Sequence, residues 1–335
     1  MIRAQFPLRG SLMKAIVLHE FGEPEVLTYE DVERPEPGPG EVLVKVHAVS
    51  VNQTLDLGIR AGTAGYNIPL PAILGIDSAG EVESVGDGGS GFAKGDRVTS
   101  ILRPPVGLGY AEYVIANARA TYHVPDGLGY PEAAAVSRHF PMAYSLCRAA
   151  EVQEDGWVLV MGAAGSLGAA AVQVAKHRGA HVIAAAGTDE RAQTGLALGA
   201  EAWVNYRSSN LAAEVKRITG GQGANAVLEN IADPDLWPGA FNSMATGGIL
   251  VTVGAHGGGR VELDVRKLYR DGLTIRSGLN HREPGDGDDA LALAAAGIYK
   301  TTIHTLLPLS QAAEAHRIAS DRSIIGKIVM DPTLG

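Results

Sequence analysis

The residues with the clearest chemical signature are the glycines of the segment WVLVMGAAGSLG, residues 157–168. An apolar run ends at Met161, glycines follow at positions 162, 165 and 168, and an alanine-rich helical pattern continues to Arg178. A second apolar run covers residues 181–186. Strand, glycine turn, helix and strand in this order predict the βαβ unit that binds a dinucleotide, because the glycines let the backbone approach a pyrophosphate and the helix N-terminus attracts its charge. The alternative is an ordinary turn of an α/β protein, since Ala163 replaces the first glycine of G-x-G-x-x-G.

The end of the second strand indicates which nicotinamide cofactor the unit would bind. NAD sites usually carry an acidic residue about 20 residues past the turn, where it holds the ribose 2′-hydroxyl. This chain has Gly187 there, followed by Thr188, which offers a hydroxyl, and by Arg191, which can pair with a phosphate. We therefore predict NADPH as the cofactor. In the alternative interpretation, Asp189 or Glu190 turns inward and Arg191 is a solvated helix residue.

Length, charge and cysteine content limit the class of protein. A chain of 335 residues is long enough for two domains. Its net charge of −9 argues against non-specific nucleic-acid binding, and its single cysteine, Cys147, excludes an intrachain disulfide and a multi-cysteine zinc site. No segment approaches the roughly 20 apolar residues of a membrane span, and the N-terminus lacks a secretory signal. We expect a cytoplasmic protein with neither membrane nor nucleic-acid partners.

Two patterns of apolar and polar residues along the chain predict which elements position these residues. The first 130 or so residues favour strands, at 14–19, 42–49, 75–85 (interrupted by Gly80) and 111–115. From Pro131 onward, short apolar runs alternate with helical patterns. This alternation predicts a parallel, doubly wound sheet, so the fold class is α/β with a β-rich part at the N-terminus.

Several motifs in this order resemble the medium-chain dehydrogenase/reductase superfamily and, within it, the zinc-free NADPH:quinone oxidoreductase-like branch. They are PGPGEVLVKVHAVSVNQTLD, LGIDSAGEVESVG, KGDRV, GAAGSLG and GAEAWVNYR, and the likeness extends over nearly the whole chain from Met13. The resemblance implies a GroES-like catalytic domain, residues 1–137 and 275–335, and a Rossmann NADP-binding domain, residues 138–274, with the active-site cleft between them. Residues 1–12 are expected to be a loose extension.

The chain departs from the zinc alcohol dehydrogenases of the same superfamily. Gln53 stands where they have a cysteine, and Gly75-Ile76-Asp77 stands where they have Gly-His-Glu. The four-cysteine lobe that holds their structural zinc is also missing. Because isoleucine cannot ligate a metal, we predict no metal site and catalysis without a metal Lewis acid.

The resemblance also implies the residues of a cofactor site. Asn52 would lie in a segment that faces the nicotinamide, and Tyr144 would lie beside the cofactor. The pyrophosphate would be wrapped by Ala164, Gly165, Ser166 and Leu167. Thr188, Arg191 and Tyr206 would surround the 2′-phosphate next to Gly187, while Gly254 and Ala255 would contact the nicotinamide ribose side. For Tyr206 the alternative is a tyrosine packed in the core.

The segment SRHFPMAY, residues 137–144, replaces a loop of small residues in the family. We expect Phe140 and Met142 to line the substrate pocket and Arg138 to hold an acidic substrate. His139 would donate a hydrogen bond to a carbonyl or carboxylate, although a structural histidine is the alternative. Asn52 and His139 are thus the candidate catalytic residues.

The function that these features predict is that of a zinc-independent, NADPH-dependent oxidoreductase, which transfers a hydride to a small-molecule quinone or activated alkene such as an enone. The alternatives are a reductase of acidic alkenes or enoyl thioesters and a non-catalytic NADPH-binding protein. The family is usually dimeric, and residues 271–279 form a β-prone segment that follows the last sheet strand. We therefore expect a homodimer or a dimer of dimers.

Overall fold

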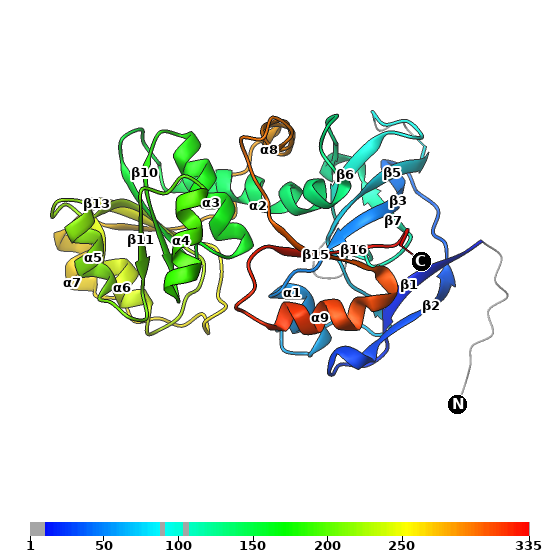
Figure 1. Cartoon of the computed structure of the whole chain (residues 1–335), viewed down its shortest axis with the longest axis horizontal. Helices are drawn as coiled ribbons and strands as arrows, with labels where there is room; N and C mark the ends of the chain where they lie inside the picture. The colour runs from blue at the N-terminus through cyan, green and yellow to red at the C-terminus, as the bar shows by residue number, and fades with distance from the viewer. Residues whose placement is uncertain (1–10, 88–90, 103–106, 335) are drawn as a thin grey trace. The chain divides into compact units, whose positions relative to one another are not determined.

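The computed structural model describes residues 11–87, 91–102 and 107–334. Its contacts divide the chain into two compact units (Figure 1), here called the terminal unit, residues 1–137 with 301–335, and the central unit, residues 138–300. The contacts place residues 275–300, which we assigned above to the catalytic domain, in the central unit. The loose extension expected at residues 1–12 lies outside the described residues, apart from Ser11 and Leu12.

The terminal unit is β-rich, as the strand patterns predict. Its larger sheet has the strand order β15-β16-β3-β5-β6-β8, with β7 also paired to β3, and a smaller sheet has the order β2-β1-β4. Its strands are β1 (Leu12–Leu18), β2 (Leu27–Glu33), β3 (Glu41–Ser50), β4 (Ala72–Ile73), β5 (Asp77–Val85), β6 (Arg97–Ile101), β7 (Tyr113–Asn117), β8 (Thr121–His123), β15 (Ile303–Pro308) and β16 (Lys327–Asp331). Its helices are α1 (Leu55–Arg60) and α9 (Ala312–Ser320), with 3-10 turns at Pro24–Val26, Ala118–Ala120 and Leu309–Gln311.

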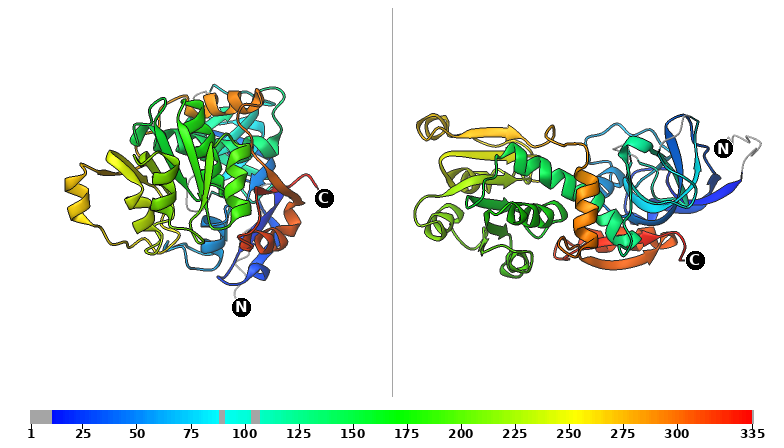
Figure 2. Two further views of the ribbon diagram at one scale, coloured as in Figure 1. Left: turned by 60° about the vertical axis from the view of Figure 1, so that its left-hand side comes forward. Right: turned by 90° about the horizontal axis from the view of Figure 1, so that it is seen from above.

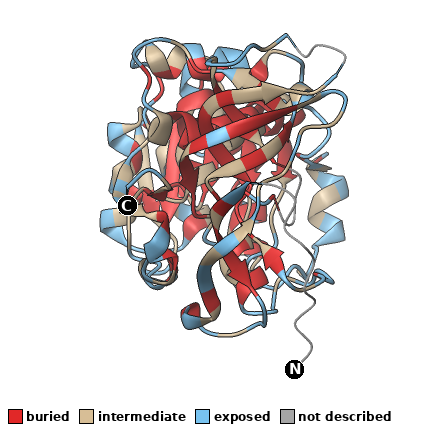
Figure 3. Ribbon diagram, turned by 90° about the vertical axis from the view of Figure 1, so that its right-hand side faces the viewer, coloured by how far each residue is buried: buried red, intermediate tan, exposed pale blue. Residues whose placement is uncertain are grey.

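Strands β3 and β5 form the centre of this unit, and Gly80 decides how closely they approach. A Cβ at Gly80 would lie 1.9 Å from the carbonyl oxygen of Lys45 on β3. Strand β5 therefore continues through Gly80 rather than breaking there, because only glycine allows this contact. Figure 3 shows buried residues along the strands of this unit. Val42, Val44 and Val82 belong to its core.

The central unit contains the predicted parallel sheet. Six strands lie in the order β11-β10-β9-β12-β13-β14, and every pairing in it is parallel. Figure 2 shows helices packed beside this sheet. Its strands are β9 (Trp157–Met161), β10 (His181–Ala186), β11 (Ala202–Asn205), β12 (Ala224–Glu229), β13 (Met244–Thr252) and β14 (Thr274–Ser277). Its helices are α3 (Ser166–His177), α4 (Asp189–Ala197), α5 (Leu211–Ile218), α6 (Trp237–Asn242), α7 (Val265–Arg270) and α8 (Asp286–Ala295).

Helix α2 (Tyr130–Ala149) corrects one expectation from the sequence. The segment 137–144 is not a loop but the middle of this continuous helix, which contains Pro141. Proline in a helix removes a backbone hydrogen bond, so tertiary packing must offset that cost. Phe140 provides this packing, because its ring stacks on Tyr299 with 4.6 Å between the ring centroids and the residue is only 2% exposed. Phe140 is therefore a core residue of the central unit, whereas Met142 is half-buried.

Among the described helices, none is both long and apolar enough to cross a membrane.

The packing of Phe140 predicts a stability effect. Phe140→Ala should lower the free energy of unfolding by about 3–5 kcal/mol, because it leaves a cavity against Tyr299. Urea denaturation of the variant would measure this loss, and Met142→Ala, two positions along the same helix, is the control with a smaller expected effect. Equal stabilities of Phe140→Ala and the wild-type protein would contradict the core assignment.

Candidate active site

The glycine turn after β9 has the geometry of a dinucleotide cradle. Gly162 adopts φ +64°, a left-handed conformation that favours glycine, and its carbonyl accepts the N–H of Gly165 at 2.9 Å. A Cβ at Gly168 would lie 2.2 Å from the carbonyl oxygen of Gly162. Helix α3 therefore approaches the turn too closely for any side chain at position 168. Ala163 is fully buried, so the departure at this position leaves the turn intact.

The four residues predicted to wrap the pyrophosphate occupy the start of α3. Ala164 and Gly165 precede the helix, while Ser166 and Leu167 begin it, and all four are half-buried. Gly165 is the N-cap and carries no side chain that could accept the first N–H groups of the helix. Those groups and the positive end of the helix dipole suit an anion. The prediction for these residues is thus geometrically consistent.

The end of β10 holds the residues predicted to choose the cofactor. Thr188 caps α4, since its Oγ1 accepts the N–H of Arg191 at 3.3 Å. The Asp189 carboxylate accepts a hydrogen bond of 2.7 Å from Asn205 Nδ2 and is therefore held by the end of β11. Asp189 thus has a partner at the end of β11, while the choice between NADPH and NADH stays a prediction.

Gly187 also brings in a residue that the sequence analysis missed. A Cβ at position 187 would lie 3.2 Å from Nε of Arg207 and 3.4 Å from Cε2 of Tyr206. Burial raises the pKa of the half-buried Tyr206, while the positive charges of Arg207 and Arg191 act in the opposite direction. One cation and one phenol thus lie against Gly187, and the charge of Arg191 acts on the same phenol. The motif NYR contains the signal for Arg207, which directly follows the predicted tyrosine.

The loops after β12 and β13 complete this edge of the sheet. A Cβ at Gly254 would lie 2.0 Å from the Asn230 carbonyl oxygen, and Asn230 Oδ1 lies 3.1 Å from where a Gly162 Cβ would be. The buried Glu229 carboxylate holds the first loop by accepting the N–H groups of residues 231 and 232, and burial raises its pKa. Ala255 is exposed beside Gly254. Asn230 is therefore a second residue at the cradle that the sequence analysis missed.

Tyr144 and His139 both lie on α2. Tyr144 is buried, its hydroxyl is 3.0 Å from that of Tyr299, and burial raises its pKa. This contact gives Tyr144 a packing role in the central unit. His139 is half-buried within the helix rather than on a loop, and its role in catalysis stays a prediction.

Asn52 belongs to the terminal unit, between β3 and α1. Its Oδ1 accepts the N–H of Leu55 at 3.3 Å, and its own N–H donates to Asp56 Oδ2 at 2.8 Å. With Oδ1 engaged in this way, the Nδ2 amide is the end of the side chain that remains to donate hydrogen bonds. Asn52 is half-buried, so it can serve as a donor to an oxygen atom.

The positions that ligate zinc in other members of the superfamily serve the fold here. Gln53 Nε2 donates to the Ala319 carbonyl oxygen at 2.9 Å, and Ile76 is fully buried. The buried Asp77 accepts from Ser50 Oγ at 3.1 Å, with Lys327 Nζ 3.9 Å away. In the described part of the chain, no three His, Cys, Asp or Glu residues come together as a metal site would require. Burial raises the pKa of the Cys147 thiol to about 12, so this residue is not a thiolate nucleophile.

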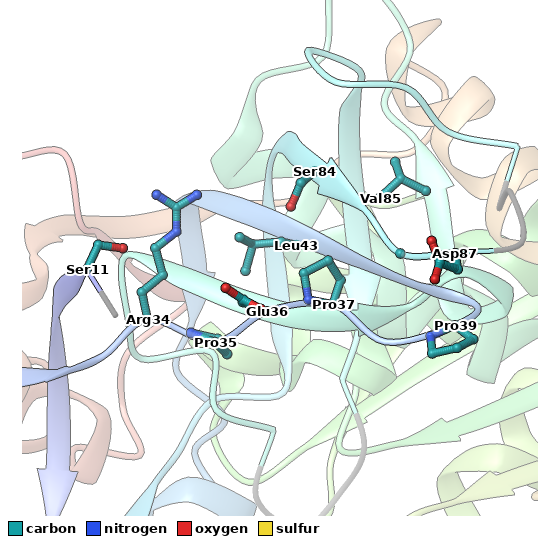
Figure 4. Close-up of a pocket in the computed structure, with 11 residues that line it drawn as sticks. Ser11, Arg34, Pro35, Glu36, Pro37, Pro39, Leu43, Ser84, Val85 and Asp87 are labelled. Atoms are coloured by element: carbon teal, nitrogen blue, oxygen red, sulfur yellow. The ribbon is translucent and has the colours of Figure 1, made fainter. Parts of the chain in front are cut away.

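Figure 4 shows a pocket on the surface of the terminal unit, and its lining residues are not among the predicted site residues. It measures about 440 Å³, and its wall includes Arg34, whose guanidinium is 3.1 Å from Glu83 and lies over the Tyr113 ring. The other lining residues are Ser11, Pro35, Glu36, Pro37, Pro39, Leu43, Ser84, Val85, Gly86 and Asp87. Because its arginine already has two partners, the pocket offers no evident chemistry.

Known proteins share this architecture. Residues 38–126 match the model of the alcohol dehydrogenase GroES-like domain, and residues 166–296 match that of the zinc-binding dehydrogenases. A quinone oxidoreductase of Sus scrofa is 34% identical over 327 residues, which cover 95% of this chain and 98% of that protein. A 2-haloacrylate reductase of Burkholderia sp is 31% identical, with coverage of 96% and 99%. The structure of mycobacterial Rv1454c complexed with NADPH has a TM-score of 0.83 and 28% identity, over 96% of this chain and 100% of that chain. The predicted GroES-like and Rossmann folds are confirmed.

The buried His316 predicts a pH dependence of stability. Burial lowers its pKa from 6.5 to about 3, with the charge of Arg60 acting in the same direction. Between these two pH values, His316 is protonated in the unfolded chain but not in the folded chain. The free energy of unfolding therefore falls as the pH drops from about 6.5 toward 3. Between pH 7 and pH 5 the wild-type protein should lose about 2 kcal/mol more than His316→Gln. Urea denaturation at both pH values measures the difference, and parallel losses would show that His316 titrates normally.

Proposed function

The chain belongs to the medium-chain dehydrogenase/reductase superfamily, in its quinone oxidoreductase-like branch, and we propose from this premise that it is a zinc-independent, NADPH-dependent reductase of quinones or activated alkenes such as enones. Its membership makes it an oxidoreductase. The observation that carries the proposal is the end of β10, where Gly187 has no carboxylate and lies against Arg207 and Tyr206.

The residues at this edge fit NADPH. Gly162 and Gly168 let α3 begin close to the end of β9, where its first N–H groups would meet the pyrophosphate. Arg191 and Arg207 would pair with the 2′-phosphate, which an acidic residue at position 187 would repel. The cofactor, when bound, supplies the hydride that reduces the acceptor. The mycobacterial relative with NADPH supports this choice.

Asn52 would stabilise the oxygen of the acceptor. As a quinone or an enone is reduced, negative charge builds on its oxygen, and the Nδ2 amide donates a hydrogen bond that strengthens with that charge. The proton that completes the reduction would come from solvent or from a side chain, and the His139 imidazole is the side chain to test. This division of roles needs no metal, since Gln53 and Ile76 are engaged in the fold.

Reduction of acidic alkenes or enoyl thioesters is the second candidate function. The relative from Burkholderia, a 2-haloacrylate reductase, favours it, because an acrylate carries a carboxylate. Arg138 is the cation that we infer would receive such a group.

A screen of acceptors tests the proposal. Loss of NADPH absorbance should follow the addition of at least one quinone or enone, and prolonged chelation should leave this rate unchanged. Turnover of acrylates or enoyl thioesters alone would favour the second candidate. Activity that chelation removes and zinc restores would refute zinc independence. If none of the acceptors tested caused NADPH oxidation, both candidates would be refuted.

The cofactor assignment predicts the effect of removing each cation. Arg191→Ala and Arg207→Ala should each weaken NADPH binding by about 10- to 150-fold, which corresponds to about 1.5–3 kcal/mol for a charge-assisted contact. NADH binding should stay nearly unchanged, because NADH lacks the 2′-phosphate. Fluorescence titration measures both affinities, and Arg217→Ala, on the exposed face of α5, is the control. Equal losses for the two cofactors would contradict the assignment.

We also propose that the protein is a homodimer, or a dimer of such dimers, and that the two copies of each dimer pair through β14. This strand is at the edge of the parallel sheet, and α7 before it exposes Val265 and Tyr269 to 60% and 67%. Pairing would satisfy the open backbone edge and cover apolar surface. Light scattering at micromolar concentration would contradict this assembly if it gave the mass of a monomer.

A further inference from the structure

A chain of buried hydrogen bonds in the terminal unit ends at Asn52. Tyr110 donates to Asp56 Oδ2 at 2.9 Å, and His316 Nε2 lies 3.1 Å from the Tyr110 hydroxyl. The same oxygen of Asp56 accepts the backbone N–H of Asn52 at 2.8 Å. Two segments that are distant in the sequence thus meet at a single carboxylate oxygen, and His316 joins them through the Tyr110 hydroxyl. All three side chains are almost completely buried.

Burial decides the direction of these bonds. Because burial keeps the His316 ring neutral, only one of its nitrogens carries a proton. The Tyr110 hydroxyl gives its own proton to Asp56, so His316 Nε2 must be the donor to the Tyr110 oxygen. Each group then has one role, and Asp56 is the acceptor at the end of the chain.

Further contacts hold the two ends of this chain. A Cβ at Gly75 would lie 2.4 Å from the ring of Tyr110, so the ring packs directly on the backbone. On α9, the His316 carbonyl oxygen accepts from Ser320 Oγ, and Gln53, next to Asn52, donates to Ala319. The Asn52 segment is therefore tied to α9 both through Asp56 and through Gln53.

We propose that Asp56, held by Tyr110 and His316, is a positioning residue that fixes the Asn52 segment so that the Asn52 amide can meet the oxygen of the acceptor. This inference rests on the proposed function, in which Asn52 donates to that oxygen. Its physical basis is geometric. The Asn52 N–H and the Tyr110 hydroxyl share one oxygen of Asp56, so removing that oxygen frees the backbone at position 52 and takes away the acceptor of both donors.

Two substitutions at position 56 distinguish the hydrogen bonds that Asp56 accepts from the negative charge that it carries. Asp56→Ala removes the shared oxygen and should lower kcat by about 10- to 100-fold with little change in KM for NADPH, because a small displacement of a catalytic group is costly. Asp56→Asn keeps a carbonyl oxygen that can accept both bonds, so kcat should recover to within about threefold of the wild-type value. Tyr110→Phe keeps the ring packing but loses one bond, and kcat should fall by about three- to tenfold.

Hydrogen exchange of the peptide that contains residues 51–56 gives a readout independent of activity. Exchange at Asn52 should accelerate in Asp56→Ala and Tyr110→Phe and return toward the wild-type rate in Asp56→Asn. Ile59→Ala is the matched control, since Ile59 is buried on the same helix and its apolar side chain takes no part in these hydrogen bonds. It should lower the melting temperature without changing kcat or exchange at Asn52.

The outcomes separate this inference from the proposed function. Asp56→Ala with wild-type kcat, or with a loss that Asp56→Asn shares in full, would overturn the positioning role. If Asp56→Ala failed to fold, wild-type kcat and exchange in Tyr110→Phe would overturn it instead. If the wild-type protein reduced no acceptor, the proposed function would fail, while unchanged exchange at Asn52 in the variants would separately overturn the inference.

Discussion

The contact between helix α3 and the Gly162 carbonyl is the constraint on which the cofactor side of the molecule depends. At the crossing, a side chain on Gly168 would come within 2.2 Å of that oxygen. This approach brings the start of the helix to the end of β9, so that the first N–H groups of α3 point at one place. Gly254 and Asn230 extend the same close packing to the neighbouring strands. Small residues at this edge are therefore required by sterics, and the anion-binding geometry follows from them.

In the proposed function, the charge around Gly187 distinguishes NADPH from NADH. A larger residue there would push Arg207 and Tyr206 away, and an acidic one would also place a negative charge beside a phosphate. Thr188 is engaged as the cap of α4, and Asp189 is engaged with Asn205. These two side chains thus have defined partners. In this proposal, position 187 is the point at which shape and electrostatics favour the same ligand.

The terminal unit solves a different problem, because it buries several charged and polar groups. Asp56, Asp77, Lys327 and His316 are all buried, and burial of ionisable groups is costly unless they are paired or neutral. Asp77 has Ser50 and Lys327 nearby, while burial keeps His316 neutral. Burial raises the pKa of Asp56 to about 6, against the hydrogen bonds from Asn52 and Tyr110 that favour its charged form. The polar core of this unit therefore ties Asn52 and the start of α1 to the distant Tyr110.

The local pattern of the sequence alone determined the βαβ unit, because strand period, glycine turn and helix are short-range features. Strands β9 and β10 end where the apolar runs do, at Met161 and Ala186. The residues from Ala164 to Leu167 and from Gly187 to Arg191 could be proposed from spacing and resemblance. The tertiary structure decided what depends on distant partners. Helix α2 continues through Pro141 because Phe140 packs on Tyr299, which a local pattern cannot show. Likewise, Arg207 became a candidate site residue only through its contact with Gly187. Asp56 became one because the fold brings together residues that are distant in the chain. Tyr110 is 54 positions from Asp56, and His316 is 206 positions from Tyr110, yet the three share one buried set of hydrogen bonds.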